Sequence, residues 1–475
     1  MTTKRASRRS VDLLALPLIG PLVRGRYGRL LLQIPLLLLA LLAIYDGLSG
    51  SSLAGLNVST VSVWVHSRGL TVLALALVGN LFCAACPLML TRGPSRLLRR
   101  ALPQFAWPRF LRNKYLTLGL TVAFLYSYEA FALWSSPWLT AWLIVGYFGA
   151  ALLTDSLFPA GTFCKFVCPL GNYNFALSGA SPTVIQARDQ GVCANCDGKY
   201  CLNGRETRDG STLDLSGLQT LPMVGAVQAK QEGRFPGCET RLYVPAMTTS
   251  QDCTLCMNCV RACPHDNVAL VLRSPLQQAM TAHPRLDLAL FLTVLTWAGL
   301  LNAFAMTPAF FGLAQFLANL IGRHEPLLLA VIVLGGLASG CALSWQAARL
   351  AGMSLREFSP VLVPLALATW GGHTLYHFLL GSSTLWPAAV HALSRLGLPL
   401  PPAAAAVVPR ADGAFLLQAI LLELSLGGAL WGLASQTPAT GGWRRLTPIV
   451  LVLVYTALAL WVFSQPMQAR AGLLS

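Results

Sequence analysis

The sequence predicts an α-helical polytopic membrane protein with one cysteine-rich α+β domain inserted between its spans. Of the 475 residues, 55% are hydrophobic and only 11% are charged, whereas about 25% are charged in a typical soluble domain. Ten of the 13 cysteines fall in the one long polar stretch, at 159–285. These observations exclude an ordinary soluble enzyme, a disordered chain and a small disulfide scaffold.

Nine apolar stretches are long enough to cross a membrane, since a span needs about 20 residues for a ~30 Å hydrocarbon core. They divide the chain into a basic N-terminal segment (1–28), spans one to four (29–158), the polar domain (159–285) and spans five to nine (286–475). The predicted spans lie at about 29–48, 69–90, 115–134, 138–158, 286–306, 326–346, 359–380, 413–434 and 448–465.

The distribution of lysine and arginine orients these spans, because basic residues collect on the cytoplasmic side. Residues 1–29, the loop 91–114 and two later connections hold 18 basic residues, whereas the opposite loops and tail hold five, Arg68 among them. We therefore expect the N-terminus and the polar domain in the cytoplasm and the C-terminus outside a bacterial-type inner membrane. The net charge of +16 follows from this topology and does not indicate nucleic-acid binding.

The polar domain contains a bacterial ferredoxin-type cysteine run, C-x2-C-x2-C-x3-C-P, which begins at Cys253. In such a run three thiolates bind one 4Fe–4S cluster and the fourth binds a second cluster. Zinc would need only four ligands, usually in two separate pairs. Upstream, C-x2-C-x4-C and one further cysteine supply the second half, although Glu239 stands where proline would follow. The predicted crossed sets are Cys193, Cys196, Cys201 and Cys263 for one cluster, and Cys238, Cys253, Cys256 and Cys259 for the other.

Two further cysteine pairs lie next to the membrane. Cys83 and Cys86 end the predicted second span, Cys164 and Cys168 follow the fourth, and a proline comes directly after each pair. Both spans run toward the cytoplasm, so the four thiols are expected to converge at that face. Three interpretations stay open: a third 4Fe–4S cluster, a dithiol relay, and simple packing of helix ends.

These motifs resemble those of the membrane polyferredoxins, a group that includes NapH-type quinol dehydrogenase subunits, NosR and CcoG-type proteins. They are most similar to those of FesM-like membrane iron–sulfur proteins. The resemblance implies electron transfer between the quinone pool and a partner oxidoreductase. NapH and NosR have C-x3-C-P twice, whereas the first pair here is C-x2-C-P. The matching segments are Gly79–Met89, Phe163–Gly171, Val192–Cys196, Gly237–Glu239 and Asp252–Asn267.

Ionisable side chains inside the spans are functional candidates, because placing them in lipid is costly. His66, Glu129, His373 and His377 are expected near the outer leaflet, and the last two are one helical turn apart. Three interpretations stay open here as well. The group could accept protons from a quinol, supply axial ligands to haem b, or form structural hydrogen bonds only.

The sequence thus predicts a membrane iron–sulfur electron-transfer protein, a candidate quinol dehydrogenase component of a respiratory oxidoreductase. Its expected partners are the membrane, quinone or quinol, and a redox partner subunit or reductase. The alternatives are an accessory protein for metalloenzyme assembly, similar to a metal-ion reductase, and a transporter with regulatory clusters. One difficulty is distance: clusters at the inner face and a quinol site at the outer face would be separated by most of a ~30 Å core.

Overall fold

Helices make up most of the computed structural model, which describes residues 11–25, 27–206, 234–281, 285–398, 401, 411–436, 444 and 446–467. Seven of the described helices are long and apolar enough to cross a membrane. The chain is therefore a multi-pass helical membrane protein, as its composition predicts. The seven are α2 (Gly28–Ser49), a continuous helix Val58–Leu77, α8 (Pro137–Leu157), α14 (Leu286–Phe304), α16 (Glu325–Leu350), α19 (Ala411–Gln436) and α20 (Leu446–Ser464).

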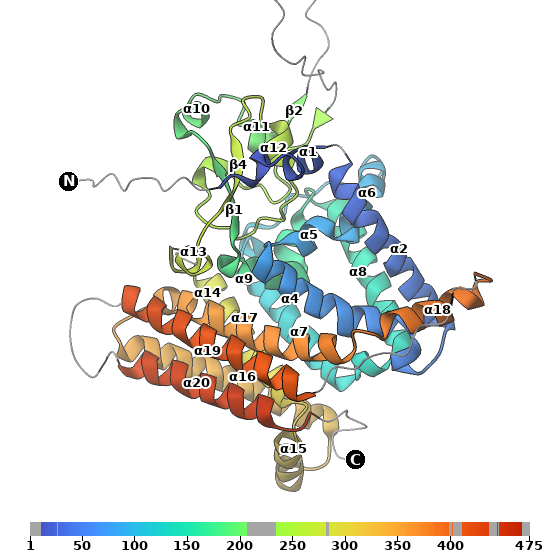
Figure 1. The fold of residues 1–475 in the computed structure, drawn as a ribbon, viewed down its shortest axis with the longest axis vertical. Helices are drawn as coiled ribbons and strands as arrows, with labels where there is room; N and C mark the ends of the chain where they lie inside the picture. Colours follow the sequence, from blue (N-terminus) through green and yellow to red (C-terminus); the bar gives the residue numbers. More distant parts are fainter. Residues whose placement is uncertain are drawn as a thin grey trace, which may run out of the picture.

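Two of the nine predicted spans form helices that do not belong to these seven. Helix α7 (Tyr115–Ala130) has only 16 residues. Helix α17 (Leu355–Leu380) has 26 residues, but it contains two prolines, two histidines and a charged first turn, which lower its mean hydropathy. Despite this, α17 packs extensively against α14 and α19 (Figure 1).

The second span lies earlier in the chain than the sequence predicts. Helix Val58–Leu77 consists of α3 (Val58–Thr60), the π-helical segment η3 (Val61–Ser67) and α4 (Arg68–Leu77), whereas the prediction was 69–90. Arg68 is consequently the eleventh of 20 residues in the span and not part of a loop before it. The prediction placed Arg68 in the loop before the span. An arginine at mid-span is costly, but two other helices supply side chains that bind it.

The N-terminal helices surround the cysteine pairs next to the membrane. Helix α2 packs along α8 and α3, and α9 packs against α7, α14 and α17. The segment directly after Cys168 therefore joins the membrane helices. The remaining elements are η2 (Ala54–Leu56), α5 (Leu81–Ala85), η4 (Pro87–Thr91), α6 (Arg92–Leu98), η5 (Arg109–Leu111), η6 (Leu133–Ser135), the π-helical segment η7 (Phe163–Val167), α9 (Pro169–Leu177) and η8 (Ser178–Ala180).

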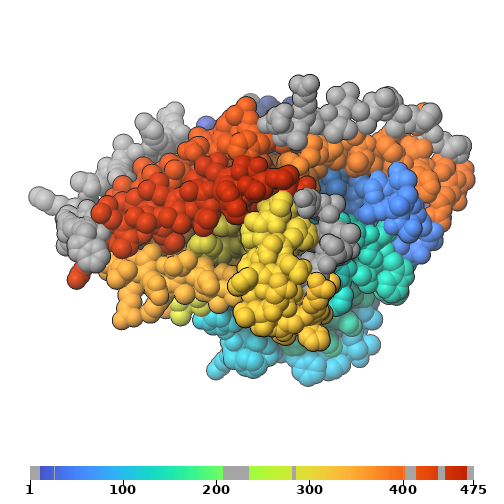
Figure 2. All heavy atoms as spheres, turned by 90° about the horizontal axis from the view of Figure 1, so that it is seen from below, coloured from blue at the N-terminus to red at the C-terminus, as the bar shows by residue number. Residues whose placement is uncertain are grey.

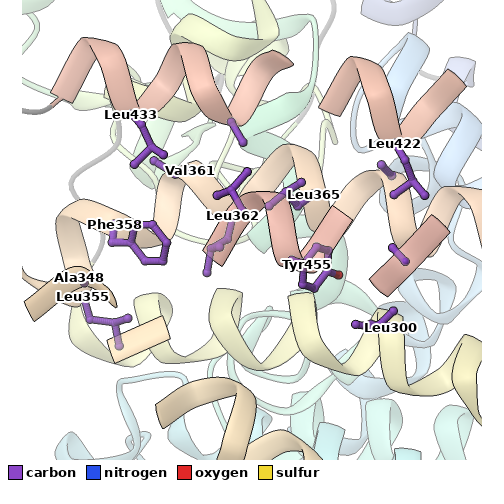
Figure 3. Packing of buried hydrophobic residues seen from close by; sticks show 14 of the residues in the cluster. Leu300, Ala348, Leu355, Phe358, Val361, Leu362, Leu365, Leu422, Leu433 and Tyr455 are labelled. Carbon is purple, nitrogen blue, oxygen red and sulfur yellow. The ribbon is translucent and has the colours of Figure 1, made fainter. Parts of the chain in front are cut away.

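The C-terminal helices share one apolar core, which is built around α17 (Figure 3). Phe358 and Leu365 of α17 and Tyr455 of α20 are almost completely buried, and the Tyr455 hydroxyl donates a 2.8 Å hydrogen bond to the Thr296 carbonyl. Seen from below, the C-terminal helices in red and the N-terminal helices in blue to cyan lie on different sides of α15 (Figure 2). The short helices of this half are α15 (Pro308–Ile321) and α18 (Leu385–Arg395).

The cysteine domain lies at one end of the membrane helices (Figure 1). Strand β1 (Thr183–Ala187) pairs antiparallel with β4 (Val268–Leu272). The N-terminal segment also belongs to this domain, since Asp12 accepts hydrogen bonds from Arg188 and from the Leu270 amide. The other elements are η1 (Leu13–Ala15), α1 (Ile19–Arg24), α10 (Gln190–Ala194), α11 (Tyr200–Asn203), β2 (Arg205–Glu206), β3 (Arg234–Phe235), η10 (Val244–Ala246), α12 (Asn258–Ala262) and α13 (Pro275–Thr281).

Candidate functional site

Twelve of the thirteen cysteines gather in three groups of four, and no cysteine forms a disulfide. Within each group, a charge on one thiol acts electrostatically on its neighbours. The groups are named here by their positions relative to the membrane helices. The membrane-face set is Cys83, Cys86, Cys164 and Cys168; the proximal set is Cys238, Cys253, Cys256 and Cys259; the distal set is Cys193, Cys196, Cys201 and Cys263.

The loop of the proximal set is folded by residues in the left-handed backbone region. Asp252, Leu255 and Met257 have φ values of 60°, 51° and 57°. Such values are uncommon for residues with large side chains, and strained backbone of this kind gathers at functional sites. Here the strain turns the chain sharply between successive cysteines, so that three thiols from seven consecutive residues face one another.

Backbone and amide N–H groups point at the sulfurs in all three sets. The Leu242 amide donates to Cys238 Sγ at 3.2 Å, and the Gly171 amide donates to Cys168 Sγ at 3.2 Å. Asn267 donates two hydrogen bonds to the distal set. Its side-chain Nδ2 donates to Cys193 Sγ at 3.2 Å, and its backbone N–H donates to Cys263 Sγ at 3.4 Å. Hydrogen bonds to sulfur stabilise thiolate charge and tune iron–sulfur centres.

The membrane-face set is formed where two helices end. Cys86 closes α5 before Pro87, and Cys168 closes the π-helical segment η7 before Pro169, the first residue of α9. Burial raises the pKa of these thiols, that of Cys168 to about 12. Cys83 and Cys168 are buried, whereas Cys86 and Cys164 are half-buried.

Among the described residues, no three His, Cys, Asp or Glu side chains are positioned to share a single metal ion. The donor chemistry nonetheless suits iron–sulfur clusters, which are held by four thiolates. Each set offers four thiols together with N–H donors directed at the sulfurs. Because the four cysteines of a cubane each bind a different iron, their sulfurs stand farther apart than the ligands of one ion.

A buried ion-pair network joins the membrane helices to the cysteine domain at Glu239. Its carboxylate contacts the guanidinium of Arg29 and that of Arg92, the second at 2.8 Å, and Arg92 also binds Asp155 at 3.2 Å. Burial alone would raise the pKa of Glu239, but Arg92 and Arg29 outweigh it and lower the pKa to about 2. The residue that departs from the ferredoxin pattern is thus the hub of this interface.

Main-chain contacts complete the same interface. The Asn80 side chain donates to the Cys253 carbonyl at 2.7 Å, and Lys165 donates to the Thr240 carbonyl at 2.8 Å. Gly161 has φ +89°, and a Cβ atom there would lie 2.0 Å from the Glu239 carbonyl oxygen. The residues that adjoin the membrane-face cysteines therefore hold the proximal set close to them.

The three sets follow one another in space. Arg29 and Arg92 act electrostatically on thiols of the membrane-face set and on Cys256 of the proximal set. Cys201 of the distal set in turn acts on Cys259. The order is membrane-face, proximal, distal.

The four predicted membrane residues are only partly brought together. Glu129 and His377 line one small cavity of about 190 Å³, and the His373 ring stacks edge-on against His377 with 4.8 Å between centroids. His66 points elsewhere: its two ring nitrogens face the carbonyls of Val61 (3.1 Å) and Ser382 (3.3 Å). His66 is therefore not among the residues that line this cavity.

Arg68 is the functional candidate that sequence reasoning missed. Its guanidinium donates to the Tyr128 hydroxyl at 3.2 Å and to the Asn302 side chain at 3.0 Å, and it lies over the rings of Trp64 and Tyr128. An arginine at the centre of a span costs at least ~2.5 kcal/mol. The π-helical segment η3 directly before it is a second signal, since such segments are frequent at functional sites.

A second, larger cavity of about 290 Å³ adjoins the first. Arg68, Trp64, Tyr128 and Asn302 line both cavities, and the larger one extends to Cys86 of the membrane-face set. Arg68 therefore lies between the larger cavity, which reaches a cysteine set, and the smaller cavity with Glu129 and His377.

Comparisons of the chain with protein-family models, with curated proteins and with solved structures gave no match.

Proposed function

We propose that this protein is a membrane-bound iron–sulfur electron-transfer protein, which exchanges electrons between the quinone pool and a partner oxidoreductase. The observation that carries the proposal is the grouping of twelve cysteines into three sets of four, one after another from the membrane helices outward. Three sets of four thiols suit three iron–sulfur clusters, because each cluster is held by four thiolates.

The residues around the sets suit the charge of such clusters. Bound to the three sets, 4Fe–4S clusters would supply one-electron carriers. The N–H donors at the sulfurs and the guanidinium groups of Arg29 and Arg92 would stabilise the negative charge of bound clusters. Glu239 holds both guanidinium groups at the boundary between the membrane-face and proximal sets. The three clusters together would form an electron-transfer path from the membrane helices to the surface of the cysteine domain.

The proposed orientation follows the distribution of basic residues, with the cysteine domain and N-terminus in the cytoplasm and the C-terminus outside. A redox partner would then dock on the cytoplasmic side, next to the distal set. At the membrane end, a quinol that becomes a quinone gives up two electrons and two protons. The electrons enter the cysteine sets singly, and Glu129 and His377 at the small cavity are candidate proton acceptors.

Iron and sulfide analysis of the full-length protein, purified without oxygen, tests this proposal. We expect about twelve iron atoms per chain, four for each set. Cys253→Ser and Cys83→Ser should each lower the count by about four and remove one reduced-cluster signal from the electron paramagnetic resonance spectrum. Cys341→Ser, which changes the one cysteine outside the three sets, is the matched control and should keep all twelve.

Three results would contradict the proposal or part of it. Zinc in place of iron would exclude electron transfer. A count of about eight that Cys83→Ser does not change would reduce the membrane-face set to a packing role. The third result is full iron content with clusters that dithionite reduces but quinol does not. It would exclude quinol as the electron donor and would leave the metal-ion reductase interpretation in its place.

A further inference from the structure

The larger cavity has a largely apolar wall that includes several aromatic rings. Trp64, Phe124, Tyr147 and Trp370 contribute aromatic side chains to its wall, and aromatic rings pack favourably against other rings. The helices that enclose this cavity come from spans that are distant in sequence, so the space exists only in the folded protein. Because these helices lie in the membrane, a ligand of the cavity would have to be soluble in lipid.

Two buried polar atoms at this cavity have no hydrogen-bond partner among the described residues. They are the hydroxyl of Tyr173 and the side-chain oxygen of Asn174, and both residues line the cavity. Asn174 is 1% exposed. Buried polar groups are satisfied in more than about nine cases out of ten, so these two atoms call for hydrogen-bond partners inside the cavity, which ordered water or a polar ligand supplies.

Arg68 adds a positive charge at the same place. Its two hydrogen bonds go to neutral groups and use two of its five N–H donors, and it lies close enough to Tyr173 to act on that hydroxyl electrostatically. A lipid phosphate is an unsuitable partner, because phosphates stay at the membrane surface and Arg68 is at mid-span. An otherwise apolar molecule that carries an oxygen fits both this charge and the aromatic wall.

We propose that the larger cavity is the quinone-binding site, in which Arg68 and Tyr173 donate hydrogen bonds to the oxygens of the quinone ring. Asn174 offers the acceptor that a quinol hydroxyl needs. This inference rests on the proposed function. It places the quinone in the larger cavity, and not at the predicted outer group of histidines and Glu129. Because Cys86 lines the same cavity, this site reaches the membrane-face set, whereas a site at the outer histidines would be separated from it by most of a ~30 Å core.

Binding of decylubiquinone and menadione to the purified full-length protein tests the assignment, with tryptophan fluorescence quenching as the readout. Tyr173→Phe removes one hydroxyl and Arg68→Gln removes the charge. Each is expected to weaken binding about tenfold, the loss of one buried hydrogen bond. Tyr126→Phe is the matched control. The Tyr126 hydroxyl lies on the same helix as Tyr128 and donates to the Pro326 carbonyl outside the cavity, so quinone binding by this variant should be unchanged.

Iron content and reduction by dithionite are measured on every variant, so that the two proposals fail separately. If the wild-type protein has its iron and binds quinone, but Tyr173→Phe and Arg68→Gln bind equally well, the cavity assignment is wrong and the proposed function stands. Labelling by a photoreactive azidoquinone sharpens this result. Label on 143–148 or 169–174 supports the larger cavity, whereas label on 377–384 alone moves the site to the small one. An iron-loaded protein that binds only phospholipid acyl chains overturns the quinone site altogether.

Discussion

The C-terminal helices and the interface of the cysteine domain with the N-terminal helices are held together by different forces. Around α17, apolar side chains such as Phe358 and Leu365 are fully buried (Figure 3). At the interface, ion pairs and hydrogen bonds to main-chain carbonyls, centred on Glu239, add to an apolar cluster that includes Ala84 and Leu255. The core around α17 is thus an apolar scaffold, and the candidate chemistry gathers where charges and cavities are buried.

The largest expected effect is the loss of core packing in the C-terminal half. Phe358→Ala should lower the free energy of unfolding by about 4 kcal/mol, because a fully buried phenylalanine leaves a cavity behind. Phe148→Ala, in the wall of the larger cavity, should cost less than half as much, since that side chain already borders empty space. Thermal unfolding of both variants in detergent measures the difference, and equal losses would remove the distinction between the two halves.

Removal of the carboxylate at the interface comes next. Glu239→Gln should destabilise the docked domain by about 3 kcal/mol, because it leaves two buried guanidinium groups without their shared partner. A lowered pKa stabilises the folded protein above the ordinary pKa of 4.5, and this contribution is lost as pH falls toward about 2.

The difference in melting temperature between wild type and Glu239→Gln should therefore stay constant from pH 7 to about pH 5 and shrink at lower pH. Phe358→Ala, measured in parallel, should show a pH-independent difference from wild type. A Glu239→Gln difference that persists unchanged to pH 3 would show that the carboxylate is not the stabilising charge.

The smallest of the three effects concerns a single backbone position. Gly161→Ala should cost about 2 kcal/mol, because the residue has a positive φ and its Cβ would collide with the Glu239 carbonyl. Gly149→Ala, in helix α8, is the control, since a Cβ atom at this position would have nothing within 4 Å. This variant should be neutral or slightly stabilising. Hydrogen exchange of the amides near Glu239 reports the loosened interface, and protection equal to wild type in Gly161→Ala would contradict the close approach.

The sequence alone determined the features that depend on neighbours in the chain. Hydropathy marks helices such as α2, α8 and α14 because a span is a continuous apolar stretch. The spacing of Cys253, Cys256 and Cys259 limits which thiols can face one another, and the clustering of the cysteines along the chain already marks the candidate site. Glu239 was visible in the sequence as a departure from the ferredoxin pattern, but its role was not.

Only the tertiary structure decided the features that depend on distant residues. Arg68 is accommodated in the membrane by Tyr128 and Asn302, which are 60 and 234 residues away. The sequence does not reveal those partners, and the predicted second span, 69–90, leaves Arg68 outside it. Glu239 meets Arg29 across 210 residues, and the larger cavity is enclosed by helices from both halves of the chain. Hydropathy and spacing act locally along the chain, whereas buried charges and cavities are defined by whatever the fold brings beside them.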